Sequence, residues 1–371
     1  MGIYKIDGTP VYEEKVFPHV DTFSPLIYHH NISEDLGQWI DHNTYHEMIV
    51  IAHISDLHND PQRYERFLSF VKDNSDIIDV AVQTGDLIDI PTDTYYTEMN
   101  AVETKVGLQP LKVVGNHERA FSSTSITNAA IYNKWNYTTN TGKTWYYKDF
   151  ASYKIRIIVV NTYESTTYPD RKYYTQEQLE WLISTLKQAK TNDYSVVIAM
   201  HPIDGARTTK NDKGFFIRAC QFEDPQIDDP MSAMTPVEDI VHAFKNGLSI
   251  QKTYSWDDGR GSSVSINDSF SGNGKFVCYM HGHYHQDMIG YSPKHTDQLY
   301  LGIATGCLKS TARPTVVWEE TSDLPRVLGE ESEDLFNLYC IDTKNNFVKV
   351  MRVGSHINDI LEERRYAVFD Y

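Results

Sequence analysis

The sequence contains few cysteines and no long apolar segment. Its 371 residues include four cysteines, which are scattered along the chain and form no Cys-x-x-Cys pair. So few thiols exclude a disulfide framework, and we expect small buried or half-buried thiols instead. Apolar runs such as residues 157–160 fall far short of the roughly 20 residues that cross a bilayer, so the sequence predicts no transmembrane segment and no membrane partner.

Positive charge is also scarce. Lys and Arg number 34 against 51 Asp and Glu, which gives a formal net charge of −17. Nucleic acids and anionic membranes bind positive surfaces, so this charge argues against both as partners. An anionic substrate is still compatible with it, because bound metal ions can dominate the local field. The first residues lack the apolar core of a secretory signal, which predicts a cytoplasmic protein or, alternatively, a virion-associated one.

Apolar residues are plentiful and follow strand and helix patterns. They make up 40% of the chain, enough for a sizeable core in one large domain or two ordinary ones. Residues 48–54 form a continuous apolar run, typical of a buried strand, and residues 62–73 carry apolar side chains on one helical face. Further strands are predicted at 79–82, 111–114, 145–147, 154–161, 195–200, 275–280, 300–305, 335–342 and 347–353, and further helices at 175–190 and 357–366. This alternation predicts the α/β class, with a second sheet packed on the first.

Three segments fall outside this alternation. Residues 1–47 carry only weak strand signals, and we interpret them as an N-terminal extension that would offer a contact to an assembly partner. Residues 119–144 are rich in Ser, Thr and Asn, and residues 203–274 end in a run rich in Gly, Ser and Asp. Long irregular segments in compact domains are usually functional lids or disordered loops, and we favour lids here. We therefore expect one domain over residues 48–371, with a lid-like insert at about 203–274.

Polar side chains gather where five of the predicted strands end. The segments are Asp56-Leu57-His58, Gly85-Asp86-Leu87-Ile88-Asp89, Gly115-Asn116-His117-Glu118, His201 and Gly282-His283-Tyr284-His285. Because strand ends of an open α/β sheet collect ligands, we expect these residues to meet. Carboxylates, an amide and imidazoles, without a thiolate, suit a pair of Mn, Fe, Zn or similar divalent ions. Two such ions bridged by one carboxylate favour displacement at phosphorus.

The order and spacing of these segments resemble those of the calcineurin-like metallophosphoesterase superfamily. Asp-x-His, Gly-Asp-x-x-Asp and Gly-Asn-His-Glu follow one another at 30-residue intervals, from Asp56 to Asp86 to Asn116. The resemblance covers about residues 48–354. It implies a four-layer α/β/β/α sandwich, in which two mostly mixed β-sheets are flanked by helices and the metals lie at one edge.

The resemblance also implies a role for each site residue. One ion would have three ligands of its own: Asp56, His58 and His285. The other ion would have Asn116, His201 and His283, and Asp86 would bridge both. His117 matches the catalytic histidine of the family, and Asp89 stands at the position of the residue that orients it. We also expect Glu118 to support the loop. The implied reaction is hydrolysis of a phosphodiester or phosphomonoester by a hydroxide between the metals, with His117 assisting the leaving group.

The remaining histidines have no place in these motifs. His281 shares the alternation of His283 and His285, and we expect it to be their neighbour. His53 and the others are expected to be structural or surface groups. A lone histidine at a strand end, as at His201, is more often structural, but the four accompanying motifs favour a ligand here.

The motifs leave the substrate open. Ile90-Pro91 follow Asp89 where Ser/Thr protein phosphatases have Arg-Gly, and Asp89 itself stands where purple acid phosphatases have a tyrosine. The acidic charge argues against the nucleases of the family. Small-molecule phosphoesters, such as nucleotides and glycerophosphodiesters, and polymers of the teichoic-acid type remain, with a diester slightly favoured. A non-catalytic assembly protein on the same fold, for example one associated with a phage tail, is the competing hypothesis. The complete set of motif residues favours an enzyme.

Overall fold

The structure of the protein is a computed structural model, which describes residues 48–121, 123–135, 138–166, 169, 171–202, 235–255, 262–283, 285, 288–292, 294–303, 334–354 and 366–371. The N-terminal extension of residues 1–47 and the first part of the insert, residues 203–234, lie outside the described residues. So does the predicted helix 357–366, except for Tyr366, which begins a strand. Among the described residues, no helix combines the length and apolar character that crossing a bilayer requires.

The first sheet is built around β1, the run at the start of the described chain that is apolar except for His53. β1 (Met48–Ile54) is buried along its whole length and lies between β2 (Val80–Gln83) and β14 (Leu335–Asp342). The strand order is β16-β15-β14-β1-β2-β3, completed by β3 (Leu111–Lys112), β15 (Phe347–Gly354) and β16 (Tyr366–Asp370). The pairs among β1, β2 and β3 are parallel and the others are antiparallel, so the sheet is mixed.

The second sheet has the order β12-β13-β11-β8-β7-β6. Its four central strands are parallel: β13 (Leu299–Gly302), β11 (Lys275–His281), β8 (Ser195–Ala199) and β7 (Ile155–Val159). The edge strands, β12 (Met288–Tyr291) and β6 (Tyr146–Phe150), pair antiparallel with their neighbours. Both sheets thus place parallel strands at their centre or on one side, and the carboxyl ends of those strands carry the polar motifs.

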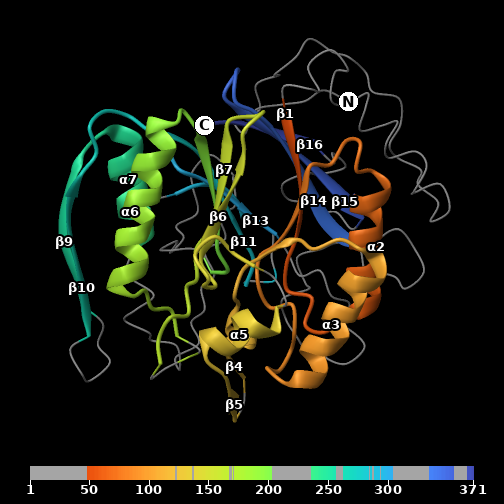
Figure 1. Cartoon of the computed structure of the whole chain (residues 1–371). Coiled ribbons are helices and arrows are strands. Elements are labelled where there is room, and N and C mark those ends of the chain that lie inside the picture. The colour runs from red at the N-terminus through yellow and green to blue at the C-terminus, as the bar shows by residue number, and fades with distance from the viewer. Residues whose placement is uncertain are drawn as a thin grey trace.

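Helices cover the outer faces of the two sheets (Figure 1). α2 (Pro61–Asp73) and α3 (Asp93–Val106) lie beside the first sheet, and α6 (Gln176–Thr191) and α7 (Pro236–Asn246) beside the second. Successive residues of the second sheet point to opposite faces and pack into two different hydrophobic cores, which shows the order of the layers. Ile157 and Val197 belong to the core shared with the first sheet, whereas Ile158 and Ile198 belong to the core formed with α6 and α7. Strands buried on both faces need apolar residues at successive positions, which explains the continuous apolar runs.

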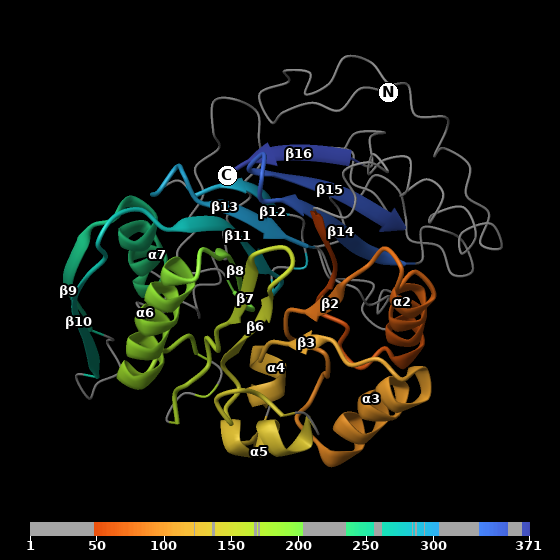
Figure 2. The ribbon, with the colours of Figure 1, turned by 45° about the horizontal axis from the view of Figure 1, so that its top comes forward.

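The predicted fold class is confirmed. Figure 2 shows the two sheets side by side between the two pairs of helices, which is the α/β/β/α order of layers. The predicted strands at 48–54, 195–200, 335–342 and 347–353 agree with β1, β8, β14 and β15 to within one residue at either end.

Two segments that the sequence suggested were irregular contain regular structure. Within residues 119–144, β4 (Ala120–Phe121) and β5 (Thr124–Ser125) form a short hairpin, and α5 (Asn128–Lys134) follows. Within residues 203–274, α7 is followed by the hairpin of β9 (Ser249–Ser255) and β10 (Ser263–Ser269). Apolar side chains of α7 and of this hairpin join the core of α6. The prediction of an irregular segment is therefore wrong for residues 236–246, 249–255 and 263–269.

Helix α3 was not predicted from the sequence, although its two ends carry clear signals. The side chain of Thr92 accepts a hydrogen bond from the backbone of Tyr95 and caps the first turn. Gly107, with a φ of 75°, ends the helix in the left-handed conformation. The buried stripe between these ends is interrupted by Glu103, which forms a buried ion pair with Lys112 at 2.6 Å. Because this charged residue lies on the buried face, the apolar residues of α3 do not show a regular helical spacing in the sequence.

Candidate metal centre

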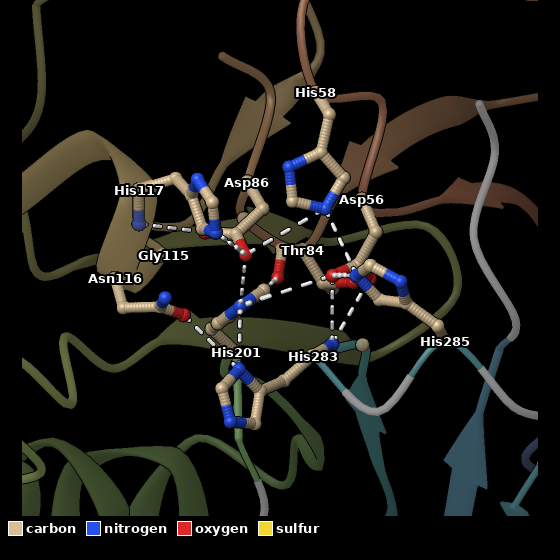
Figure 3. Close-up of polar contacts among 12 residues, drawn as sticks. Asp56, His58, Thr84, Asp86, Gly115, Asn116, His117, His201, His283 and His285 are labelled. Carbon is tan, nitrogen blue, oxygen red and sulfur yellow. Dashed lines mark hydrogen bonds and ion pairs between the residues drawn. The ribbon is translucent and has the colours of Figure 1, made fainter. Parts of the chain in front are cut away.

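The five polar segments meet at one end of the two sheets (Figure 3). Asp56 follows β1, Asp86 follows β2, and Asn116 begins the short helix α4 (Asn116–Arg119) after β3. His201 and His283 follow β8 and β11 of the second sheet. Figure 3 shows these side chains pointing toward one another. The structure therefore brings together residues that lie more than 200 positions apart in the sequence, at the strand ends where the sequence predicted them.

Four side chains form a first cluster: Asp56, His58, Asp86 and His285. One ligand atom from each lies within 4.8 Å of the others. His58 Nε2 is 2.9 Å from His285 Nε2, which is in turn 3.3 Å from Asp56 Oδ1. Two ring nitrogens can face each other at this distance only if a proton or a cation lies between them. The cluster thus has the donor atoms and the spacing of a cation site.

A second cluster shares Asp86 with the first. Ligand atoms of Asp86, His201 and His283 lie within 4.8 Å of one another. His201 Nε2 is 3.2 Å from Asp86 Oδ2, and His283 Nδ1 is 3.2 Å from His201 Nε2. The side-chain oxygen of Asn116 joins them, 3.0 Å from His283 Nδ1. Each cluster offers oxygen and imidazole donors, so the residues present fit two divalent ions that share one carboxylate.

Both carboxylates of the clusters are ionised at neutral pH. Burial disfavours their charged forms, but it is outweighed by the histidines around them. The charge of His201 foremost holds the pKa of Asp86 well below its usual range. The hydrogen bond of His285 and the charge of His201 do the same for the pKa of Asp56. Ionised carboxylates are the form that binds cations.

The histidines fall into two electrostatic groups. Burial lowers the pKa of His58 to about 4 and that of His283 to about 3, which leaves their rings neutral and able to bind metal. Burial also disfavours the charged form of His201, but the charge and hydrogen bond of Asp86 raise its pKa to about 9. Nδ1 of His201 donates to the carbonyl oxygen of Thr84 at 2.6 Å, so Nε2 is the atom that faces Asp86. A cation at this place would take the position of the Nε2 proton.

The backbone of the ligand loops adopts a conformation that side chains rarely take. The φ angles are 54° at Asp56, 47° at His58, 52° at Asp86, 75° at His283 and 54° at His285. Left-handed backbone at residues other than glycine costs on the order of 1–3 kcal/mol each and clusters at functional sites. Five such residues in one site indicate that the loops are shaped to aim these side chains inward.

Two motif glycines permit the close approach of the loops. A Cβ at Gly115 would collide with the carboxylate of Asp86, and a Cβ at Gly282 would collide with that of Asp56. Neither neighbour can move away without leaving its cluster. The glycines of the motifs are thus explained by space at the site rather than by turn conformation alone.

Glu118 holds the loop that carries Asp86. Its carboxylate accepts hydrogen bonds of 2.6–3.2 Å from the backbone N–H groups of Asp86, Leu87, Ile88 and Gly115. Burial, with a further contribution from the charge of Asp86, raises the pKa of Glu118 to about 7. The four N–H donors offset part of the free-energy cost of burying the ionised Glu118 carboxylate. The geometry agrees with the supporting role that the sequence suggested.

His117 and Asp89 lie beside the two clusters. Nδ1 of His117 donates to the backbone carbonyl oxygen of Asp89 at 2.7 Å, which directs Nε2 toward Asp86, 3.9 Å from its Oδ2. The carboxylate of Asp89 is 3.7 Å from His117 Nδ1 and 3.6 Å from His58 Nδ1. The side chain of Asp89 therefore faces two rings, whereas its main chain makes the short hydrogen bond to His117.

Replacing Asp89 with alanine is expected to weaken the first ion more than it impairs His117. The substitution keeps the carbonyl that orients His117 but removes the carboxylate beside His58. Loss of a group that supports a ligating histidine typically costs about tenfold or more in metal affinity. Calorimetric titration with Mn²⁺ would measure this, with turnover determined at saturating Mn²⁺. Full metal affinity combined with lost turnover would contradict the prediction and assign the carboxylate to His117.

Several residues near the site escaped the sequence-based prediction. Phe121 stacks on the His117 ring, with centroids 4.2 Å apart. The hydroxyl of Tyr163 donates to the side-chain oxygen of Asn116 at 3.4 Å. In the sequence, only its place four residues after His117 connects Phe121 with the site. No motif in the sequence connects Tyr163 with the site. His281 and His53 are both buried, which agrees with the neighbouring and structural roles expected for them.

The fold and the two clusters define a dinuclear metal-binding α/β/β/α sandwich. Residues 49–228 match the sequence model of the Metallophos family, the calcineurin-like phosphoesterases. This match confirms the resemblance seen in the motifs.

Comparison with solved structures agrees with this fold. The chain is similar to a dimetal phosphatase from Danio rerio, with a TM-score of 0.51 and 11% identity, over 87% of this chain and 99% of that one. It is also similar to a conserved uncharacterized protein from Streptococcus pneumoniae, a predicted phosphoesterase, with a TM-score of 0.31 and 11% identity, over 87% of this chain and 98% of that one. At such identity the first comparison shows the fold alone. No curated protein sequence matches the chain.

Proposed function

We propose that the protein is a metal-dependent hydrolase of phosphoesters, with a diester somewhat favoured over a monoester. The observation that carries the proposal is the position of Asp86, whose carboxylate belongs to both clusters while His117 Nε2 lies 3.9 Å from it. A shared carboxylate with a histidine beside it suits in-line displacement at phosphorus. The family of residues 49–228 supports the same class of reaction.

Each group of the site then has a defined task. Bound divalent ions would supply an activated water and offset the negative charge that builds on the phosphoryl oxygens. Asp56, His58 and His285 would hold one ion, and Asn116, His201 and His283 the other. Asp86, which the two clusters share, would hold both.

His117 would serve the leaving group. Its Nδ1 proton is committed to the carbonyl of Asp89, so Nε2 is the atom that faces the reaction. The side chain is 10% exposed, which would leave an edge open to a bound ester. A proton on Nε2 can be given to the departing oxygen, as general acid catalysis requires.

A metal analysis coupled to two assays would test the proposal. The full chain would be stripped with a chelator, reloaded with Mn²⁺, Fe²⁺ or Zn²⁺, and assayed with p-nitrophenyl phosphate and bis-p-nitrophenyl phosphate. We expect about two ions per chain, no turnover after stripping and recovery on reloading. A chain that binds two ions yet cleaves neither ester would instead support the non-catalytic assembly protein.

A further inference from the structure

A chain of buried polar side chains runs from β15 to the metal centre. Its members are Arg352 on β15, Asn337 and Tyr339 on β14, His53 on β1 and Thr84 just after β2, and each is at most 1% exposed. Polar groups inside an apolar core are costly unless they are hydrogen bonded. Four members in one sheet and a fifth directly after one of its strands therefore need an explanation beyond filling space.

The register of the sheet places these residues side by side. Arg352 is the cross-strand partner of Asn337, and Asn337 is the partner of His53. Cross-strand partners share a face of the sheet, so the three side chains emerge in one row. Tyr339 lies two residues beyond Asn337 on the same strand and shares that face.

Each member forms a hydrogen bond with the next. Arg352 Nε donates to Asn337 Oδ1 at 2.6 Å, and Asn337 Nδ2 donates to the Tyr339 hydroxyl at 3.0 Å. His53 Nδ1 is 3.0 Å from that hydroxyl, and His53 Nε2 is 2.7 Å from the hydroxyl of Thr84. The backbone carbonyl of Thr84 then accepts the 2.6 Å hydrogen bond from His201 Nδ1.

The arginine gives this chain a direction. A guanidinium can only donate, so it fixes the Asn337 amide with its oxygen toward Arg352 and its NH₂ toward Tyr339. The Tyr339 hydroxyl accepts from that NH₂ and can give its own proton to His53 Nδ1. His53 would then carry its proton on Nε2 and donate to Thr84. Burial lowers the pKa of His53 well below its ordinary value, which agrees with a neutral ring that has one donor and one acceptor nitrogen.

We propose that Arg352, Asn337, Tyr339 and His53 are positioning residues for the metal centre. They act through Thr84, whose carbonyl sets the tautomer and the ring direction of His201. The inference rests on the proposed function, in which His201 binds one of the ions. It assigns a task to two strands, β14 and β15, that contribute no ligand of their own to the described clusters.

The direction of the chain can be tested without metal. Long-range ¹⁵N–¹H NMR of the stripped, full-length protein reports which ring nitrogen of His53 is protonated. We expect Nε2–H in the parent. Asn337→Asp offers a carboxylate that cannot donate to Tyr339, so the hydroxyl turns its proton toward the carboxylate and the proton of His53 moves to Nδ1. A parent with Nδ1–H, or an unchanged tautomer in the variant, would overturn the directed chain.

The effect on the metal centre is tested by deleting one hydroxyl. Tyr339→Phe interrupts the chain, and we expect one of the two Mn²⁺ ions to bind about tenfold more weakly in calorimetric titration, as is typical when the support of a ligating histidine is lost. The matched control is Tyr64→Phe, because Tyr64 is equally buried and its hydroxyl donates to Glu103 at 2.6 Å on α3, away from the site.

The outcomes of the two tests are separable. Unchanged Mn²⁺ affinities in Tyr339→Phe, or an equal loss in Tyr64→Phe, would show that the hydrogen bonds only satisfy buried groups and would overturn the positioning role. Should Tyr339→Phe fail to fold, the Mn²⁺ titration of Asn337→Asp decides in its place, with the same criterion. A parent protein that binds no Mn²⁺ would refute the proposed function and the positioning role with it. The tautomer of His53 in the metal-free protein would still decide the direction of the hydrogen bonds.

Discussion

Replacement of His117 by alanine is expected to lower turnover about 100-fold or more, the range of general acid catalysis, while both ions bind with the affinity of the parent. His117 lies outside the two ligand clusters that share Asp86. Its backbone N–H donates to Asp86 Oδ1 at 2.9 Å, and alanine preserves this hydrogen bond. The variant should therefore lose only the imidazole that faces the reaction. Steady-state kinetics at saturating Mn²⁺, with a parallel Mn²⁺ titration, would measure both quantities.

The leaving group provides a sharper form of this experiment. A general acid matters most when the departing oxygen is basic, so the loss should be larger for an alkyl ester than for a p-nitrophenyl ester. His242→Ala is the control, because His242 lies on α7 and interacts with Asp297 rather than with the metal clusters. An equal loss with both esters would contradict the acid role and leave His117 with charge stabilisation alone. Parental rates would refute any catalytic role.

The strands of the fold were easier to predict from the sequence than the helices that cover them. β1 and β8 are buried on both faces, so all their residues except His53 and Ser195 are apolar and the pattern is easily recognised. Helix α3 buries Glu103 on its inner face, where Lys112 and Tyr64 satisfy the charge. That compensation comes from elsewhere in the fold and is not visible in the local sequence. For this reason the spacing of apolar residues did not predict α3.

The residues that form the two clusters were recognisable for a different reason. They follow strands in short motifs whose order is preserved along the chain, so neither distances nor angles were needed to recognise them. The support behind them has no such signature. His53 belongs to an apolar run and Tyr339 to a distant strand, and only the register of β14 against β1 brings them together. Likewise, the division of Asp89 between its main chain, which holds His117, and its carboxylate, which faces His58, depends on the loop geometry.

Substitution of Asp86 by asparagine is expected to weaken both ions together. Asp86 Oδ2 is 3.2 Å from His201 Nε2 in the second cluster and 4.0 Å from His58 Nε2 in the first. The amide keeps the size of the side chain and an oxygen to accept from the His117 backbone, but it loses the charge that both clusters share. We expect each Mn²⁺ affinity to fall by about 100-fold or more, beyond the effect typical of residues that merely support a ligand. Calorimetric titration of the stripped variant would measure the two affinities.

Asp56→Asn is the matched comparison, because it removes the same charge from a residue that belongs to the first cluster alone. Asp56 is as deeply buried as Asp86, so the two substitutions impose a similar burden on folding. Asp56→Asn should weaken one ion strongly and leave the other bound at least as tightly, because a neighbouring cation no longer repels it. If Asp86→Asn likewise affected one ion only, the carboxylate would be an ordinary ligand. The two clusters would then be separate sites, and a shared attack on phosphorus would lose its structural basis.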